Sequence, residues 1–288
     1  MLLNEIFSPG TEEVLRAAGL TQGMHVADIG CGAGITALWM ARFVGSSGSV
    51  MSVDFSAEQL QIAERSARAA GLTNIRFREA TAYETGLSQE SFDLVFSRFL
   101  MCHLTEPLKA LLEMRRILKT GGILVCEDHD DAGVFTEPPT NAYKRLAEIS
   151  AAVNRANGLD SSIGLKLPRM VCEAGFQQIE VRVKQLPFLR GFAKRFWEIT
   201  LREAKPAILA TKATTPEELE SLCSEMRAIA RDESILTYVG SHHSSVGSKV
   251  KAESVATPCL RENDGPERNV PGRILSAPNG TGATAWSA

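Results

Sequence analysis

A short apolar run that ends in three closely spaced glycines constrains the fold of this 288-residue chain more than any other stretch. Residues 24–29 are mostly apolar and lead into Gly30, Gly32 and Gly34, and a helix-compatible segment, residues 35–43, follows at once. Glycine accepts positive φ and lets the backbone approach a ligand closely, and a helix N-terminus offers free N–H groups with a partial positive charge. The pattern predicts a buried strand, a tight turn and a helix, which together suit a nucleotide-like ligand at the carboxyl edge of a parallel sheet.

Two side chains separate this turn from the dinucleotide-binding turn, whose pattern is G-x-G-x-x-G. Ile35 stands where that pattern requires its last glycine or alanine, and Asp28 lies inside the strand, just before the turn. A carboxylate here would repel a pyrophosphate but attract a cation, such as the ammonium group of an amino acid. Asp54 ends the next predicted strand, at a spacing typical of an acid that accepts hydrogen bonds from ribose hydroxyls.

The Asp28 to Gly34 motif, Asp54 and the later stretch 118–122 (Leu-Lys-Thr-Gly-Gly) resemble class I S-adenosylmethionine-dependent methyltransferases. The resemblance covers residues 12–183 and implies S-adenosyl-L-methionine as the cofactor. It also implies a Rossmann-like, three-layer α/β sandwich with a mostly parallel, nominally seven-stranded sheet. Read together with the physical argument, it gives roles to nine residues. Asp28, Gly30, Gly32, Gly34 and Ser97 would hold the methionine portion, Asp54 the ribose, and Phe55, Thr81 and Ala82 the adenine.

The remaining periodicity fits this fold as far as residue 240. Apolar strands and amphipathic helices alternate up to residue 183, which indicates a parallel α/β domain. Residues 191–232 return to helical spacing between strands 6 and 7, where they are either a substrate cover or plain surface helices. Residues 241–288 are rich in Ser, Gly and Pro and show no periodicity, so we expect a disordered tail. The seventh strand would then be weak, near Val246–Val250, or be replaced, for instance by a rewritten C-terminus.

Two histidines are candidates for taking a proton from the methyl acceptor. His103 follows the predicted fourth strand and His129 the fifth, at the edge where an open α/β sheet binds ligands. A neutral histidine accepts a proton near pH 7, although each could instead be a solvent-facing or hydrogen-bonded loop residue. Because a sulfonium methyl is already electrophilic, a base is needed only if the acceptor arrives protonated.

Arg98 and Met101 follow the same fourth strand and are candidates for binding the substrate. Arg98 would meet an acidic group of the substrate, or it would form a salt bridge with Glu127 or Asp128. The acids within residues 128–131 would bind a cation or a metal, or they would form a solvated loop. We predict no metal, because the six cysteines are scattered and include no C-x-x-C pair. Among them, Cys102 is expected to line the pocket rather than to act as a nucleophile.

Composition limits the partners of the chain. A net charge of −3 gives no electrostatic footprint for nucleic acid, and no apolar run approaches the length of a membrane span. The N-terminus lacks the charged and apolar blocks of a signal peptide, so we expect a cytoplasmic protein with a small-molecule substrate. Its oligomeric state is left open. Two other functions also stay open, an NAD-dependent oxidoreductase and a non-catalytic binding protein with this fold.

Overall fold

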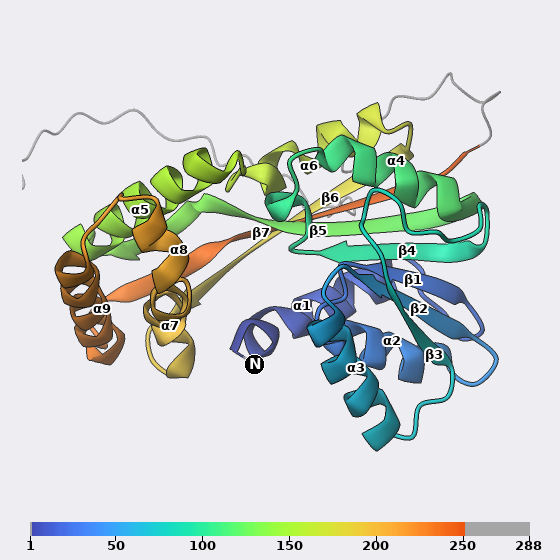
Figure 1. Ribbon diagram of the computed structural model, residues 1–288, viewed down its shortest axis with the longest axis horizontal. Coiled ribbons are helices and arrows are strands. Elements are labelled where there is room, and N and C mark those ends of the chain that lie inside the picture. Colours follow the sequence, from blue (N-terminus) through green and yellow to red (C-terminus); the bar gives the residue numbers. More distant parts are fainter. Residues whose placement is uncertain (1, 251–288) are drawn as a thin grey trace, which may run out of the picture.

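The computed structural model describes residues 2–250, which build a seven-stranded sheet with helices on both faces (Figure 1). The strand order is β3-β2-β1-β4-β5-β7-β6. Strands β1 to β5 pair in parallel, whereas β7 runs antiparallel to both of its neighbours. The predicted three-layer, mostly parallel fold is therefore confirmed. The strands are β1 (His25–Ile29), β2 (Ser49–Asp54), β3 (Ile75–Glu79), β4 (Phe92–Arg98), β5 (Leu118–Glu137), β6 (Gln177–Phe188) and β7 (Leu236–Ser248).

The helices begin where the sequence offers starting signals. The Ser56 hydroxyl accepts the Gln59 N–H at 3.3 Å, and Thr215 and Glu218 form a reciprocal capping box ahead of the last helix. None of the helices within residues 2–250 is long and apolar enough to cross a membrane. The helices are α1 (Leu2–Ala17), α2 (Ile35–Val44), α3 (Ala57–Ala69), α4 (Pro107–Ile117), α5 (Asn141–Asn157), α6 (Ile163–Glu173), α7 (Phe196–Glu203), α8 (Lys205–Ala210) and α9 (Pro216–Arg231), with 3-10 turns at Met101–His103 and Phe192–Arg195.

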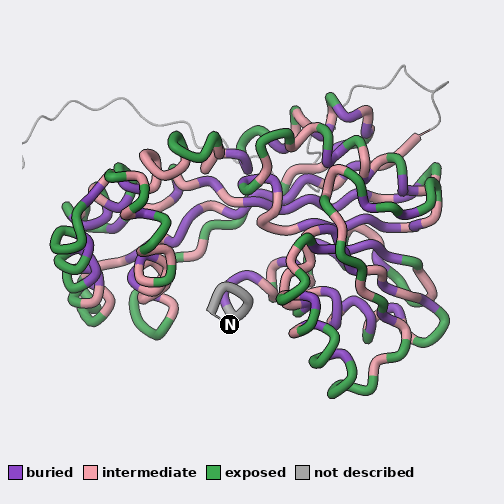
Figure 2. The backbone as a smooth tube through the Cα atoms, viewed as in Figure 1, coloured by how far each residue is buried: buried purple, intermediate pink, exposed green. Residues whose placement is uncertain are grey.

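The central strands are apolar on both faces, as expected of a covered parallel sheet. Alternate residues of β1, β4 and β5 pack into two different cores. Val26, Leu94 and Val125 pack with α1 and α2. Ala27, Val95 and Leu124 pack with α4 and α6 on the other face. In Figure 2 the buried backbone accordingly follows the middle of the sheet, while the exposed stretches lie on the outer helices.

Three long strands extend the sheet beyond its parallel part. β5, β7 and β6 continue to one side of the molecule in Figure 1 and carry α5, α7, α8 and α9 there. These helices have an apolar core of their own, in which Tyr143 and Leu146 of α5 meet Leu219 and Leu222 of α9. The structure thus contains the predicted helical insertion between β6 and β7. Its role as a substrate cover stays a proposal.

The prediction of a disordered tail from residue 241 onward is wrong for residues 241–248. They complete β7, in which Val246 pairs with Val125 of β5 and with Glu180 of β6. The segment lacks apolar periodicity, and the two strands beside it satisfy its backbone. Among its side chains, the Ser244 hydroxyl donates to Glu127 of β5 at 2.8 Å. The strand also starts earlier, at Leu236, than the weak strand expected near Val246–Val250. Residues 251–288 of the predicted tail lie outside the described residues.

Candidate active site

The glycine turn between β1 and α2 uses each of its three glycines differently. All three have positive φ, at 77° for Gly30, 50° for Gly32 and 78° for Gly34. A Cβ at Gly34 would lie 2.7 Å from Cβ of Ala63, and one at Gly30 would lie 2.9 Å from Cδ1 of Leu100. A Cβ at Gly32 would meet nothing within 4 Å. Packing therefore requires Gly34, while Gly30 lies against the flexible end of Leu100 and Gly32 leaves its backbone accessible to a ligand.

A cavity of about 190 Å³ lies against this turn. Asp28 closes one end of it, at the end of β1, with only 2% of its surface exposed. Burial raises the pKa of the Asp28 carboxyl to about 7, with the positive charge of Arg98 opposing the shift and the negative charge of Asp54 adding to it. A cationic ligand group beside Asp28 would favour its ionised form. The site therefore fits an ammonium group better than a phosphate.

Asp54 joins the glycine turn to the start of α3. Its Oδ2 accepts the Gly32 N–H at 2.8 Å, and its Oδ1 accepts the Ser56 N–H at 2.9 Å. An ionised carboxylate can accept further bonds on the same oxygens, so hydroxyl groups of a ligand can still bind there. The next side chain, Phe55, is 78% exposed and offers a free aromatic face at this edge. The Thr81 hydroxyl accepts the Glu84 N–H at 3.2 Å and keeps its own proton for a ligand.

Two residues predicted for the site do not reach the cavity. Ser97 is fully buried and its hydroxyl donates to Sγ of Cys126 at 3.3 Å. Side chains alternate along a strand, so its neighbours on β4 face the other way, and Arg98 lines the cavity instead. Met101 is 1% exposed and lies in the apolar core beside α4 and α6. Packing therefore accounts for Met101, and the predicted substrate contact is not supported.

The face of the sheet beneath α1 carries a row of polar side chains that crosses three strands, β4, β5 and β7. Arg98 on β4 pairs in register with Glu127 on β5, which pairs with Ser244 on β7. Glu127 is 1% exposed. The Thr11 hydroxyl of α1 donates to Glu127 Oε2 at 2.6 Å and accepts from Arg98 Nη1 at 3.0 Å. Sequence reasoning considered Glu127 only as a partner of Arg98 and missed Thr11, because no local pattern links α1 to β5.

His129 lies on the same face as Glu127, two residues further along β5. Its Nδ1 is 3.2 Å from Asp128 Oδ1, and its Nε2 is 3.4 Å from Asp131 Oδ1. Burial lowers the pKa of His129, but the hydrogen bond and charge of Asp128 and the charge of Asp131 outweigh it, so the pKa lies above its ordinary value. The acids expected in a solvated loop are thus largely buried around this ring. His103, the other candidate base, is the exposed residue at the end of the 3-10 turn Met101–His103.

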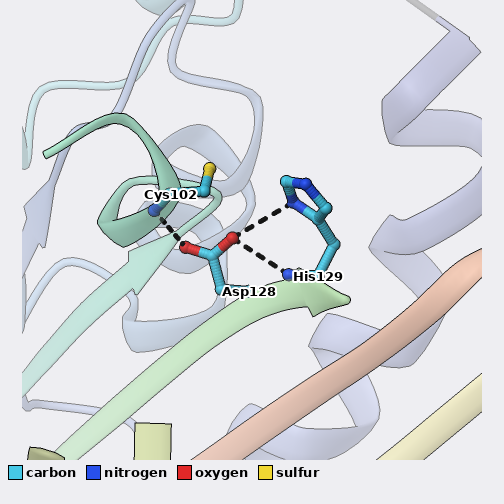
Figure 3. Close-up of side chains that lie close together, drawn as sticks. All are labelled: Cys102, Asp128 and His129. Carbon is cyan, nitrogen blue, oxygen red and sulfur yellow. Dashed lines mark hydrogen bonds and ion pairs between the residues drawn. The ribbon is translucent and has the colours of Figure 1, made fainter. Parts of the chain in front are cut away.

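Figure 3 shows how Cys102, Asp128 and His129 converge where the turn after β4 meets β5. Their potential ligand atoms lie within 4.8 Å of one another, so in geometry this group within residues 2–250 could hold a metal ion. Asp128 is already engaged, since Oδ2 accepts the Cys102 N–H at 3.2 Å and Oδ1 accepts the His129 N–H at 2.9 Å. Burial and then the charge of Asp128 raise the pKa of the Cys102 thiol, which favours a neutral thiol. We interpret the group as the support of His129.

An aromatic cluster, formed by Phe7, Phe99, Phe196, Trp197 and His242, adjoins the cavity. The Phe99 ring lies 5.1 Å from both Phe7 and His242, centroid to centroid, and 5.9 Å from His129. Phe99 also lines the cavity beside the glycine turn, and its φ of 52° is uncommon for a residue with a side chain. Its N–H donates to the Glu127 carbonyl at 2.9 Å, which holds it there. Phe99 thus joins the cavity to the two histidines.

Comparison with known proteins agrees with this geometry. The family model described as a methyltransferase domain matches residues 20–179. The chain is similar to the demethylmenaquinone methyltransferase of Geobacillus kaustophilus, with 26% identity over 199 residues that cover 63% of this chain and 81% of that protein. It is also similar to the demethylmenaquinone methyltransferase of Staphylococcus aureus, with 33% identity over 115 residues that cover 40% of this chain and 47% of that protein. The chain therefore spans most of one relative and about half of the other.

Among solved structures, the chain is similar to the YcgJ protein of Bacillus subtilis. The TM-score is 0.56 at 20% identity, and the match covers 83% of this chain and 97% of that one. At this identity the similarity concerns the fold, and the chemistry has to be argued from the site itself.

Proposed function

The chain belongs to the S-adenosylmethionine-dependent methyltransferases, and from this premise we propose that it methylates a planar aromatic small molecule that carries ring oxygens. One observation carries the proposal. Phe99 lies between the cavity at the glycine turn and an aromatic cluster that holds two histidines. A methyl donor on one side of Phe99 and a flat ring on the other would meet at this residue.

The residues at the cavity fit the cofactor. Asp28 would pair with the ammonium group of the methionine portion, and the open backbone at Gly32 would lie along it. Asp54 would accept hydrogen bonds from the ribose hydroxyls, and the exposed Phe55 ring would lie against the adenine, whose edge would meet Thr81 and Ala82. When bound, S-adenosylmethionine supplies a methyl group on a sulfonium that is already electrophilic. The protein's main task is then to align the acceptor with that methyl group.

The acceptor class follows from the aromatic cluster and from the names of the relatives. Rings of Phe7, Phe99, Phe196 and Trp197 gather between α1 and the helical insertion and favour a flat, apolar partner. The two curated relatives are named for a quinone-type substrate. A cover formed by the helical insertion would exclude water from such an acceptor.

His129 would act as the base if the acceptor is a hydroxyl or a carbon made nucleophilic by loss of a proton. Asp128 and Asp131 hold its ring from both sides. These acids stabilise the imidazolium that forms when His129 accepts the proton. Arg98, half-buried at the cavity, and the buried Glu127 would keep α1 in place through Thr11 rather than bind an acidic substrate.

The competing functions make different predictions. Ile35 and Asp28 argue against an NAD-dependent oxidoreductase. Calorimetric titration should therefore detect binding of S-adenosylhomocysteine but no binding of NAD. A non-catalytic binding protein would bind S-adenosylhomocysteine without turnover. A cytoplasmic location and the absence of nucleic-acid partners stay predictions from the sequence.

Label transfer from S-adenosylmethionine with a tritiated methyl group tests the proposal directly. We expect transfer to demethylmenaquinol or to the simpler 1,4-naphthohydroquinone. Binding of S-adenosylhomocysteine without transfer to any oxygenated ring would refute the acceptor class, while failure to bind S-adenosylhomocysteine would refute the cofactor assignment.

A further inference from the structure

His242 is a buried side chain whose Nε2 has no hydrogen-bond partner. The residue is 4% exposed, and its Nε2 makes no hydrogen bond. Glu127 Oε2 lies 3.8 Å from this nitrogen, which is beyond hydrogen-bond distance. Buried polar groups in native proteins nearly always have partners, so an orphan of this kind calls for an explanation.

The surroundings of His242 point to a ligand rather than to packing alone. Its ring lies 5.2 Å from Phe7 and 5.1 Å from Phe99, so it forms one wall of the aromatic cluster. It also borders a cavity of about 250 Å³ between α1 and strands β6 and β7, which leaves space beside the ring. His129 is its direct partner across β5 and β7. His242 therefore combines contact with the aromatic cluster, an adjoining cavity and an Nε2 without a hydrogen-bond partner.

We propose that His242 contacts the acceptor, its Nε2 forming a hydrogen bond to an oxygen on the acceptor ring. This inference rests on the proposed function and extends it, because it makes the last strand, β7, the element that recognises where the ring carries oxygen. Neutral imidazole can donate to a carbonyl or accept from a hydroxyl, according to its tautomer. An aromatic compound of the same shape without oxygen would leave the nitrogen unpaired and bind more weakly.

The electrostatics of the site agree with a neutral role for His242. Burial and then the positive charge of Arg98 lower the pKa of His242 to about 3. Asp128 opposes this shift, while His129 and His243 add to it. The pKa values of the two facing imidazoles thus shift in opposite directions. His129 is suited to take up a proton, and His242 is suited to stay uncharged. Such divergence between neighbouring groups is typical of sites in which each has its own task.

The adjacent residue supplies a matched control. His243 is also buried, at 6% exposed, and its Nε2 is also without a partner. Because side chains alternate along β7, it faces the opposite side of the sheet, away from Phe7 and Phe99. Substitution of His243 changes a buried histidine of the same strand without touching the proposed contact.

The experiment compares two probes in the full-length protein saturated with S-adenosylhomocysteine. 1,4-Naphthoquinone carries ring oxygens and naphthalene does not; dissociation constants are measured by equilibrium dialysis. The variants H242F and H242M remove the ring nitrogen while keeping an apolar side chain, and two are used so that a folding defect in one leaves the other. H242Q restores a donor near the Nε2 position, and H243F is the control. Affinity for S-adenosylhomocysteine reports whether each variant is folded.

We expect H242F and H242M to bind naphthoquinone about tenfold more weakly or worse, with naphthalene changed less than about twofold. H242Q should recover most of the affinity, and H243F should behave as wild type. Equal losses for both probes, or no loss for either, would overturn the role of His242 while leaving the methyltransferase assignment intact. If wild type binds S-adenosylhomocysteine but neither probe, the aromatic acceptor class itself fails, and the inference fails with it.

Discussion

His129 and His242 lie opposite each other on antiparallel strands β5 and β7, and the ring of Phe99 contacts both. Phe99 also borders the cavity at the glycine turn, so this one ring links that cavity to both imidazoles. The charges around the two histidines have opposite signs. Asp128 and Asp131 surround His129, whereas the positive charge of Arg98 lowers the pKa of His242. A pair arranged in this way can divide proton transfer and ring recognition between its members.

The pH profile of methyl transfer should report His129. The pKa of His129 lies above its ordinary value of 6.5, and the base must be unprotonated, so kcat/KM should rise with pH through that raised pKa. D131N removes a negative charge that stabilises the imidazolium, so the profile should move to lower pH. D160N, in an exposed loop paired with Lys166, serves as the control and should leave the profile in place. An unchanged profile in D131N would exclude His129 as the titrating base.

Asp28 should make cofactor binding depend on pH. The pKa of its carboxyl is about 7 without ligand, and only the ionised form pairs with an ammonium group. Affinity for S-adenosylhomocysteine should therefore fall by up to about tenfold for each pH unit below 7 and level off above it. In D28N the affinity should be at least about tenfold weaker at pH 8 and lose this dependence.

5′-Methylthioadenosine, which lacks the amino-acid portion, is the matched ligand for this test. Calorimetry should find its affinity independent of pH and nearly equal in wild type and D28N. A pH dependence shared by both ligands would place its origin elsewhere in the site.

Two glycine substitutions should separate packing from ligand contact. G34A combines a φ of 78° with a Cβ placed 2.7 Å from Cβ of Ala63, and it should reduce the free energy of unfolding by about 2–4 kcal/mol. G32A has a φ of 50° but open space around the new Cβ, so it should cost only about 1 kcal/mol. Its affinity for S-adenosylhomocysteine should nevertheless fall. Urea unfolding and calorimetry measure both quantities, and equal instability of the two variants would contradict the assigned packing.

The helical insertion should depend on a buried carboxylate. Glu198 lies 2.8 Å from Arg195, 2.8 Å from Arg202 and 2.6 Å from Arg227. Burial raises the pKa of Glu198, but the three arginines outweigh it and hold the pKa at about 2. The stabilisation is therefore complete above the unfolded pKa of 4.5 and is lost as pH falls toward 2.

E198Q should lower the free energy of unfolding by about 1–3 kcal/mol at pH 7, a figure that allows for the partly exposed arginines. It should also flatten the acid dependence between pH 4.5 and 2. E220Q, which removes a half-exposed partner of Arg202, should change the free energy of unfolding much less than E198Q does. Denaturant unfolding over this pH range measures both, and identical acid profiles in E198Q and wild type would contradict the assignment.

The parts of the site that depend on local spacing could be predicted from the sequence. Asp28, the three glycines and Asp54 lie within two neighbouring strands and their turns, so their order along the chain determines their arrangement. The residue of β4 that faces the cavity could not be predicted in this way. Side chains alternate along a strand, so a shift of one residue decides whether Ser97 or Arg98 faces the cavity. This choice depends on the packing of β4 between two cores.

The residues that β7 contributes to the site could not be predicted from local sequence patterns. Residues 241–248 lack apolar periodicity because both of their neighbours in the sheet, rather than a solvent-facing pattern, determine their conformation. The sequence therefore places His242 in the expected tail, outside the two candidate bases. Its relation to His129 exists only after the helical insertion returns the chain to the sheet, between β5 and β6.

The place of β7 also sets the order in which the two halves of the site can form on the ribosome. The segments that carry Asp28 and Asp54, which are β1, the glycine turn and β2, emerge before the other strands. The contacts among these segments need no later part of the chain. β7 emerges after every other strand among residues 2–250 but belongs between β5 and β6. A nascent chain thus holds two unpaired strand edges until residue 248 has left the exit tunnel. During synthesis, the wall that holds His242 is consequently the last part of the pocket to be built.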